Sequence, residues 1–369
     1  MNRSFTRAFA AVLALSMPAA AQLFTLTPVA DNTLYQDASG SLSNGAGTTL
    51  YCGRTGSFGG SPSARRTLLK FDIAAIAPPG MAIIYADLTM QCSQGQGGNA
   101  QIEVRRMTSA WGEGASDAGV PGGGGAAAAA GDATWLHTFH SGSFWTTPGG
   151  DFTPGFSAKT TVNSTGTYVF GPTFELKNDA QDMLVNPGLN HGWMLLAPEI
   201  PGQAKRFESR ESLGSEPTLT LIFAPAFPAV KTSVGTGCIG SSGLPFTLDA
   251  FGYTGAPVLG DDSYAFFAFN GPVNTFSTLF FSTNTVAPQS FGGGCNLYID
   301  LNGLVLYASL GFGPFPVFID SSGVGGLAFA IPPVFQLTGF SSAVQVFCPD
   351  AGNPAGFVLS NALALTLGV

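Results

Sequence analysis

The chain has 369 residues, of which 45% are hydrophobic and only 10% charged, with 50 Gly, 25 Pro and 31 Phe. Charge-driven disorder needs few aromatics, and a helical bundle needs abundant Glu, Lys and Leu, so this composition argues against both and favours an all-β fold. The net charge is −8 and no Lys/Arg-rich run occurs, which argues against nucleic-acid binding.

The first 21 residues have the layout of a secretory signal peptide. Two arginines precede an apolar run at residues 8–15, and small residues before Gln22 fit cleavage by signal peptidase. The run falls short of the ~20 residues that a bilayer requires, so we expect a leader and no membrane anchor. Residues 1–21 are therefore predicted to direct secretion to the extracellular space or the cell surface.

Alternating apolar and polar residues predict short antiparallel strands in the first half of the chain, separated by Gly/Ser/Pro-rich spacers. The expected strands span residues 67–72, 100–107, 167–170, 192–197 and 218–223. Residues 176–185 predict one short helix, because Leu176, Ala180 and Leu184 share a helical face and Pro187-Gly188 follows.

Composition changes near residues 223–231, a segment punctuated by proline. After Lys231 there is no Lys, Arg, Glu or His, and 18 of the 31 Phe lie from Phe227 onward. Such a shift marks a domain boundary. We predict a first domain at 22–224, a linker at 225–231 and a second domain at 232–369.

In the second domain, residues 296–301 and 304–310 flank Asn302-Gly303, a pair that favours a two-residue hairpin turn. Residues 359–369 predict a final strand. The sequence thus predicts two antiparallel β-sandwich domains, jelly-roll-like in shape, with one short helix in the first.

Five cysteines in a secreted chain predict disulfide pairing. Pairing Cys52 with Cys92 and Cys238 with Cys295 keeps each bond within one domain, although spacing alone does not fix connectivity. Cys348 would then be a buried free thiol.

Sequence motifs point away from enzyme chemistry. No nucleophile elbow, zinc-protease motif, phosphate-binding loop or dinucleotide fingerprint occurs, so a non-enzymatic protein without a cofactor is expected. His137 and His140 would point to opposite faces of a strand and could not share a metal. Asp31, Asn32 and Asp37 offer oxygen ligands for calcium, but without the spacing of a known calcium loop.

A cationic and aromatic set is the stronger candidate site. Guanidinium groups bind carboxylates and hydroxyls, and indole rings offer flat faces to sugar rings. The candidate ligand-binding residues are Arg66, Lys70, Arg105, Trp111, Trp135, Trp145, Arg206 and Arg210. In the alternative interpretation, Arg66 and Arg210 are buried ion-pair partners of acidic residues and Trp111 belongs to the core.

Several segments occur in the order seen in one known family. They are residues 30–34 (ADNTL), 66–72 (RTLLKFD), 104–111 (VRRMTSAW), 131–135 (GDATW), 190–196 (NHGWMLL) and 206–211 (RFESRE). In this order, residues 29–224 resemble the DNRLRE domain family, which is related to carbohydrate-binding module family 96. The resemblance implies a secreted β-sandwich with glycan binding in some members.

The second domain is similar to uncharacterised terminal β domains of secreted bacterial proteins, and this similarity implies no activity. The leading hypothesis is a secreted, non-catalytic protein that binds a polysaccharide or cell-surface glycan. The alternatives are a structural or adhesion spacer of the cell surface and an accessory part of a polysaccharide-degrading system.

Overall fold

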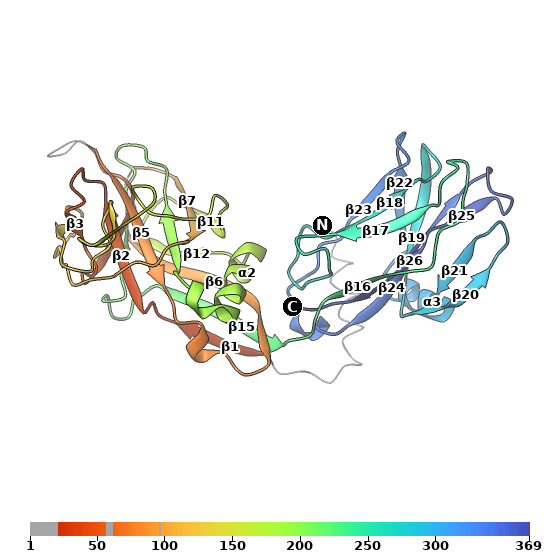
Figure 1. Cartoon of the computed structure of the whole chain (residues 1–369), viewed down its shortest axis with the longest axis horizontal. Helices are drawn as coiled ribbons and strands as arrows, with labels where there is room; N and C mark the ends of the chain where they lie inside the picture. Colours follow the sequence, from red (N-terminus) through yellow and green to blue (C-terminus); the bar gives the residue numbers. More distant parts are fainter. Residues whose placement is uncertain (1–20, 57–61, 96) are drawn as a thin grey trace. The chain divides into compact units, whose positions relative to one another are not determined.

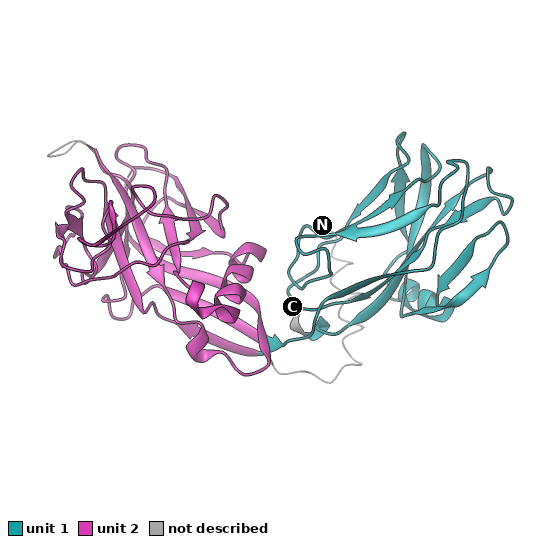
Figure 2. Ribbon diagram, viewed as in Figure 1, with its two compact units in different colours: residues 1–21, 224–369 teal, residues 22–223 magenta. Residues whose placement is uncertain are grey.

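The structure, a computed structural model, describes residues 21–56, 62–95 and 97–369. The predicted leader lies outside these residues except for Ala21. The chain divides into two compact units, which we call the N-terminal unit (residues 22–223) and the C-terminal unit (residues 224–369) (Figure 2). Both are built of antiparallel strands, so the predicted all-β class is confirmed.

The described residues of the N-terminal unit form fifteen strands and one α-helix, and Figure 1 labels α2 and the larger strands. The strands are β1 (Gln22–Leu26), β2 (Ala30–Tyr35), β3 (Leu42–Ser43), β4 (Thr49–Arg54), β5 (Ala64–Lys70), β6 (Met81–Gln94), β7 (Ala100–Arg106), β8 (Ala126–Ala127), β9 (His137–Phe139), β10 (Ser143–Phe144), β11 (Ala158–Val162), β12 (Gly166–Phe170), β13 (Trp193–Leu196), β14 (Lys205–Glu208) and β15 (Thr218–Pro225). The helix is α2 (Phe174–Val185), and 3-10 turns occur at Ala74–Ile76 and Pro187–Leu189.

Most of these strands form one large sheet in the order β1-β15-β6-β14-β4-β5-β13-β7-β11, with β12 beside β6 and β2 beside β5. Its inner residues pack with α2 into the main core, which includes Leu50, Phe207 and Trp193. The Thr173 hydroxyl accepts a hydrogen bond from the Leu176 N–H and caps α2 at its start. The predicted strands and helix of this unit are confirmed.

The sheet around β5, β13 and β7 is buried on both faces. Leu69 and Leu195 pack into the main core, whereas the adjacent residues Leu68 and Met194 pack into a second cluster on the opposite face. Because neighbouring residues of a strand point to opposite faces, this second face needs its own cover. Residues 108–152, which we call the covering segment, supply that cover and carry the indoles of the second cluster.

The predicted bond between Cys52 and Cys92 is wrong, since both residues are buried free thiols. The reason is strand order. Cys52 on β4 lies opposite Lys205 of β14, and Cys92 on β6 lies opposite Phe207 of the same strand. Strand β14 therefore separates the two cysteines by two inter-strand spacings, about 9.6 Å, whereas a disulfide needs Cα atoms within about 7 Å.

The C-terminal unit is a sandwich of smaller sheets. Its elements are β16 (Val230–Val234), β17 (Thr247–Phe251), β18 (Ala265–Phe269), β19 (Thr275–Ser282), β20 (Thr285–Ser290), β21 (Asn296–Ile299), α3 (Leu301–Ser309), β22 (Phe315–Ile319), β23 (Gly325–Ala328), a 3-10 turn (Phe335–Leu337), β24 (Ser341–Pro349), β25 (Phe357–Leu359) and β26 (Ala362–Thr366). A sheet of order β16-β26-β24-β19-β22, with β25 beside β24, accompanies the sheets β17-β18-β23 and β20-β21. Phe266 of β18 meets Phe281 of β19 with ring centres 5.6 Å apart, so the two larger sheets pack face to face.

The predicted hairpin at Asn302-Gly303 is wrong, because these residues begin helix α3. The Asp300 carboxylate accepts hydrogen bonds from the N–H groups of Asn302 and Gly303, which is an N-cap arrangement. Gly303 is buried, and a Cβ there would lie 2.3 Å from the Thr283 Oγ1. The glycine therefore permits close packing of the helix against the end of β19 and forms no turn.

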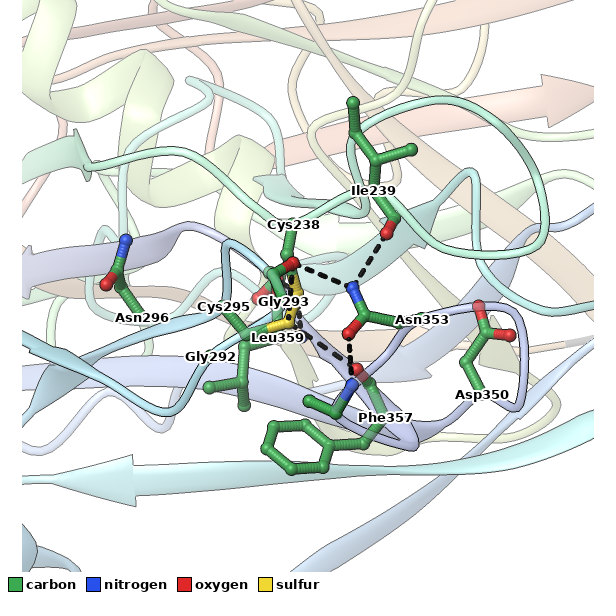
Figure 3. The surroundings of a disulfide bond; sticks show 12 residues. Cys238, Ile239, Gly292, Gly293, Cys295, Asn296, Asp350, Asn353, Phe357 and Leu359 are labelled. Atoms are coloured by element: carbon green, nitrogen blue, oxygen red, sulfur yellow. Dashed lines mark hydrogen bonds between the residues drawn. A yellow bond between two sulfur atoms is a disulfide. The ribbon is translucent and has the colours of Figure 1, made fainter.

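The predicted disulfide between Cys238 and Cys295 is confirmed, and Cys348 is a buried free thiol as expected. Figure 3 shows how the surrounding loops converge on this bond. The Asn353 side-chain amide donates to the carbonyls of Ile239, which follows Cys238 directly, and Gly293, which lies two residues before Cys295. The bond therefore joins the loop before β17 to the β20–β21 hairpin.

Candidate functional site

A pocket of about 480 Å³ lies in the N-terminal unit beside the end of the covering segment. It is lined by Arg66, Thr108, Ser109, Thr146, Thr147, Pro148, Gly150, Asp151 and Phe152. Its volume falls within the range of ordinary small-ligand sites. Strand β5 contributes Arg66, the segment after β7 contributes Thr108 and Ser109, and the loop after Trp145 contributes the remainder.

Asp151 holds this loop in shape. Its carboxylate accepts hydrogen bonds from the backbone N–H groups of Thr146 and Thr147 and from the Ser109 hydroxyl, at 2.9–3.0 Å. Partial burial opposes ionisation of Asp151, but these donors outweigh it and keep its pKa below the ordinary value. The pocket therefore contains a fixed carboxylate that is ionised at neutral pH.

Arg66 forms the opposite wall, with its guanidinium between two aromatic rings. Its Cζ lies 4.7 Å from the Trp135 ring centre and 5.7 Å from the Phe152 ring centre. The guanidinium donates one hydrogen bond to the Gly149 carbonyl and two to Glu199. Of its five N–H groups, two make no hydrogen bond with the described residues.

Gly149 makes this arrangement possible. Its φ is +94°, and a Cβ there would lie 2.5 Å from the Arg66 Nη1 and 2.9 Å from the Trp135 ring. Only glycine adopts such a backbone freely and leaves room for both groups. The loop conformation and the position of the guanidinium therefore depend on each other.

Arg105 is the second arginine in contact with Phe152, with its Cζ 5.7 Å from the ring centre. Its guanidinium donates to Glu103 and to the carbonyls of Thr153 and Pro154. Phe152 thus contacts two cations, each already paired with a glutamate. With those pairs neutralised, Asp151 leaves the pocket slightly anionic.

The structure brings together three of the predicted ligand-binding residues: Arg66, Arg105 and Trp135. The other cations lie elsewhere in the unit. Arg206 on β14 donates to Ser93, Arg210 pairs with Glu113 and Glu211, and Lys70 ends β5. The alternative interpretation therefore holds in part, since Arg66 and Arg210 are both ion-pair partners of acidic residues but neither side chain is fully buried.

The three tryptophans are not surface platforms. Trp111, Trp135 and Trp145 are only 7%, 8% and 5% exposed and belong to the second cluster. Two of the indoles donate to backbone carbonyls, Trp111 to His191 and Trp145 to Thr134. The prediction that they offer flat faces to a sugar is therefore wrong, because the covering segment uses them as its core.

Sequence reasoning missed Thr146, Thr147, Asp151 and Phe152. The usable signal was the Gly149-Gly150-Asp151 run, in which two glycines precede an Asx-type acceptor. Such a run indicates a tightly folded loop, and tightly folded loops on a rigid sheet often carry binding residues.

The predicted calcium ligands do not form one site. Asn32 is buried, and its side-chain oxygen accepts from the N–H groups of Thr33 and Asn44. Asp37 lies in an exposed turn with Ser39 and Ser41, roughly 20 Å along the extended chain from Asp31. In the described part of the chain, no group of three or more His, Cys, Asp or Glu side chains could hold a metal.

Asp31 instead belongs to a buried ionic cluster. It accepts from the Arg210 backbone N–H at 2.7 Å, and its own N–H donates to Glu113, which also binds the Arg210 guanidinium. Burial, opposed by the Arg210 hydrogen bond, raises the pKa of Asp31 well above its ordinary value.

The expectation that His137 and His140 face apart is also wrong. Their ring centres lie 5.0 Å apart, because β9 ends at Phe139 and the chain bends after it. The Nδ1 of His137 lies 2.9 Å from the Thr134 hydroxyl, and burial together with the neighbouring His140 lowers its pKa. The pair is a packing contact within the covering segment.

Comparison with known proteins adds no relative. No family model matches the chain, and no curated protein is similar to it. The resemblance of residues 29–224 to the DNRLRE family thus stays a prediction. Across the residues that the structure covers, none of the helices has the length and apolar character needed to cross a bilayer.

Proposed function

We propose that the N-terminal unit binds a neutral polysaccharide or cell-surface glycan in the pocket around Arg66, Asp151 and Phe152. The observation that supports this proposal is the combination of hydrogen-bonding and aromatic groups in the pocket. A guanidinium with two unused N–H groups faces a pocket that also holds an ionised carboxylate and a half-buried aromatic ring. Sugars present hydroxyls, which both donate and accept, and an apolar C–H face that packs on aromatic rings.

The charge of the pocket favours neutral over acidic sugars. Both nearby arginines are paired with glutamates, and Asp151 adds a further negative charge. An acidic sugar would meet this carboxylate at close range, where like charges repel. We therefore expect neutral glycans to bind more tightly than uronic-acid polymers.

The predicted export of the chain is consistent with an extracellular glycan as the partner. Residues 1–21 predict a signal peptide, and the Cys238–Cys295 bond is compatible with an oxidising compartment. The binding activity is proposed to be non-catalytic, and the release of reducing ends from a bound polysaccharide would contradict that part of the proposal.

Affinity gel electrophoresis of the full chain tests the proposal, with neutral β-glucans, xylans and mannans in one set of gels and alginate and pectate in another. Retardation by a neutral polymer is expected. Thr147→Val removes one exposed hydroxyl that lines the pocket, so binding should weaken about two- to tenfold, the range of one hydrogen bond. Thr161→Val removes an exposed hydroxyl on β11 and should bind as the wild type does.

The competing function is a structural or adhesion spacer of the cell surface. It is favoured by the burial of Trp111, Trp135 and Trp145 and by the internal pairing of Arg105 and Arg210. Absence of retardation on every polysaccharide, with an intact melting transition, would favour the spacer. Equal retardation of both threonine variants and the wild type would place binding outside this pocket.

A further inference from the structure

The C-terminal unit contains a second pocket, of about 290 Å³, between α3, the β20–β21 hairpin and β25. Its mouth is formed by Phe291 after β20 and Leu301 at the start of α3, which are 51% and 45% exposed. Leu297, Phe357 and Leu359 form deeper parts of its lining. A concave site with an exposed apolar rim differs from the single hydrophobic residues that are commonly exposed on protein surfaces.

The walls of this pocket are fixed in place. Leu301 and Leu304 lie three residues apart on α3 and therefore share a face, and the Asp300 N-cap anchors the start of that helix. Cys295 lies in the chain between Phe291 and Leu297, and its disulfide partner Cys238 donates its backbone N–H to Leu359. The disulfide thus joins the hairpin wall to the β25 wall.

The pocket offers no polar group to a ligand. Gln345 is the polar residue among those that line it, and its side chain is fully engaged. Its Nε2 donates to the carbonyls of Asn296 and Ser360, and its Oε1 accepts from the Tyr298 N–H. A ligand with hydrogen-bonding groups would lose its bonds to water here and gain none.

The charged residues of the C-terminal unit indicate that the ligand is uncharged. Residues 232–369, which include every residue that lines the pocket, contain no Lys, Arg or His. An anionic head group such as a carboxylate would therefore find no cationic side chain among these residues. The acid closest in sequence to the rim is Asp300, whose negative charge would repel such a group. A cationic ligand would meet no carboxylate among the lining residues, and the nearby Asp300 carboxylate is already hydrogen-bonded to the N–H groups of Asn302 and Gly303.

We infer that this pocket binds one uncharged hydrocarbon ligand, taken up by its apolar part. A buried apolar cavity of about 150 Å³ already binds benzene, so 290 Å³ suits one short alkyl chain or a fused pair of rings. The inference concerns the C-terminal unit alone and does not depend on glycan binding.

Fluorescence titration of the full chain with N-phenyl-1-naphthylamine, an uncharged probe in which a naphthalene and a phenyl ring are joined by an amine, tests this inference. We expect saturable binding at one site per chain, and weaker binding of the anionic analogue 1-anilinonaphthalene-8-sulfonate. Leu301→Gln places an amide on the rim and should weaken probe binding about tenfold. Leu306→Gln makes the same change on another face of the same helix, outside the lining, and should alter probe binding less than about twofold.

Both substituted side chains are exposed, so both variants are expected to fold, and their circular dichroism spectra and melting temperatures verify this. Equal affinities of the two variants would overturn the inference, as would unsaturable binding. Sedimentation equilibrium tests whether a second copy of the chain, and no small ligand, occupies the pocket. The inference would also be overturned if the wild type were a dimer, if either glutamine substitution made it monomeric, and if the monomer bound no probe. That result would assign this face to a second copy of the chain.

Discussion

Removing the crosslink of the C-terminal unit, as Cys238→Ala with Cys295→Ala, should destabilise that unit alone. Alanine is chosen because both cysteines are buried and alanine introduces no polar group at either position. The bond spans 57 residues of sequence, for which the chain-entropy relation gives about 4 kcal/mol of stabilisation at 25 °C. For a unit of roughly 150 residues, whose unfolding entropy is about 0.3 kcal/mol per kelvin, this corresponds to a melting temperature lower by about 10–15 °C.

The two units can be followed separately because all four tryptophans lie between residues 111 and 193. Tryptophan fluorescence therefore records the N-terminal unit, and far-UV circular dichroism records both. Cys348→Ala is the matched control, since it truncates a buried cysteine of the same unit without opening a crosslink. A shift below about 3 °C, or an equal shift in the fluorescence transition, would refute the entropic reasoning.

Three further predictions concern the N-terminal unit and the free thiols. Burial raises the folded-state pKa of Asp31 above 3.8, so the folded state keeps this proton at a pH where the unfolded state has lost it. The free energy of unfolding should therefore fall as the pH rises above 3.8. Asp31→Asn should remove this fall and stabilise the unit at pH 7, as measured by urea unfolding followed by tryptophan fluorescence. Native protein should expose no thiol to Ellman's reagent and denatured protein three, namely Cys52, Cys92 and Cys348, and a count of one would indicate a second disulfide. Gly149→Ala should cost about 1–3 kcal/mol in the same unfolding assay, and an unchanged midpoint would contradict the geometry described for that loop.

The strands of the N-terminal unit could be predicted because their alternation is local. Residues 100–107 alternate, and β7 indeed places Ile102 and Val104 in the core. The Asn302-Gly303 hairpin failed because the same two residues also suit the first turn of a helix behind an N-cap aspartate. Which outcome wins depends on Ser282 and Thr283, which pack against Gly303 from another part of the chain.

The cysteine pairing shows where local reasoning ends. The Cys238–Cys295 bond and the absent Cys52–Cys92 bond are equally plausible from spacing. The difference is the insertion of β14 between β4 and β6, and β14 comes more than a hundred residues after Cys92. Strand order is a property of the whole sheet, so no feature near either cysteine could reveal it.

The tryptophans failed as site predictions for a related reason. An indole suits a ligand-binding face and a core equally, since in both it needs apolar surroundings and one acceptor for its N–H. The sheet around β5 and β13 is covered on both faces, so the covering segment must bring large side chains of its own. Counting aromatics therefore could not separate platform from core, whereas the arginine stacked on Trp135 marks where that core reaches the surface.

The two pockets divide the chemistry of the chain between its units. All cations of the sequence after the leader lie at or before Lys231, so charged and hydrogen-bonding recognition is concentrated in the N-terminal unit. The C-terminal unit replaces charge with phenylalanine and a disulfide, and its pocket is correspondingly apolar. Two ligands of opposite polarity should then bind without competing. A neutral glycan that displaced the naphthylamine probe would contradict this division, because a sugar has nothing to gain in a pocket without free donors or acceptors.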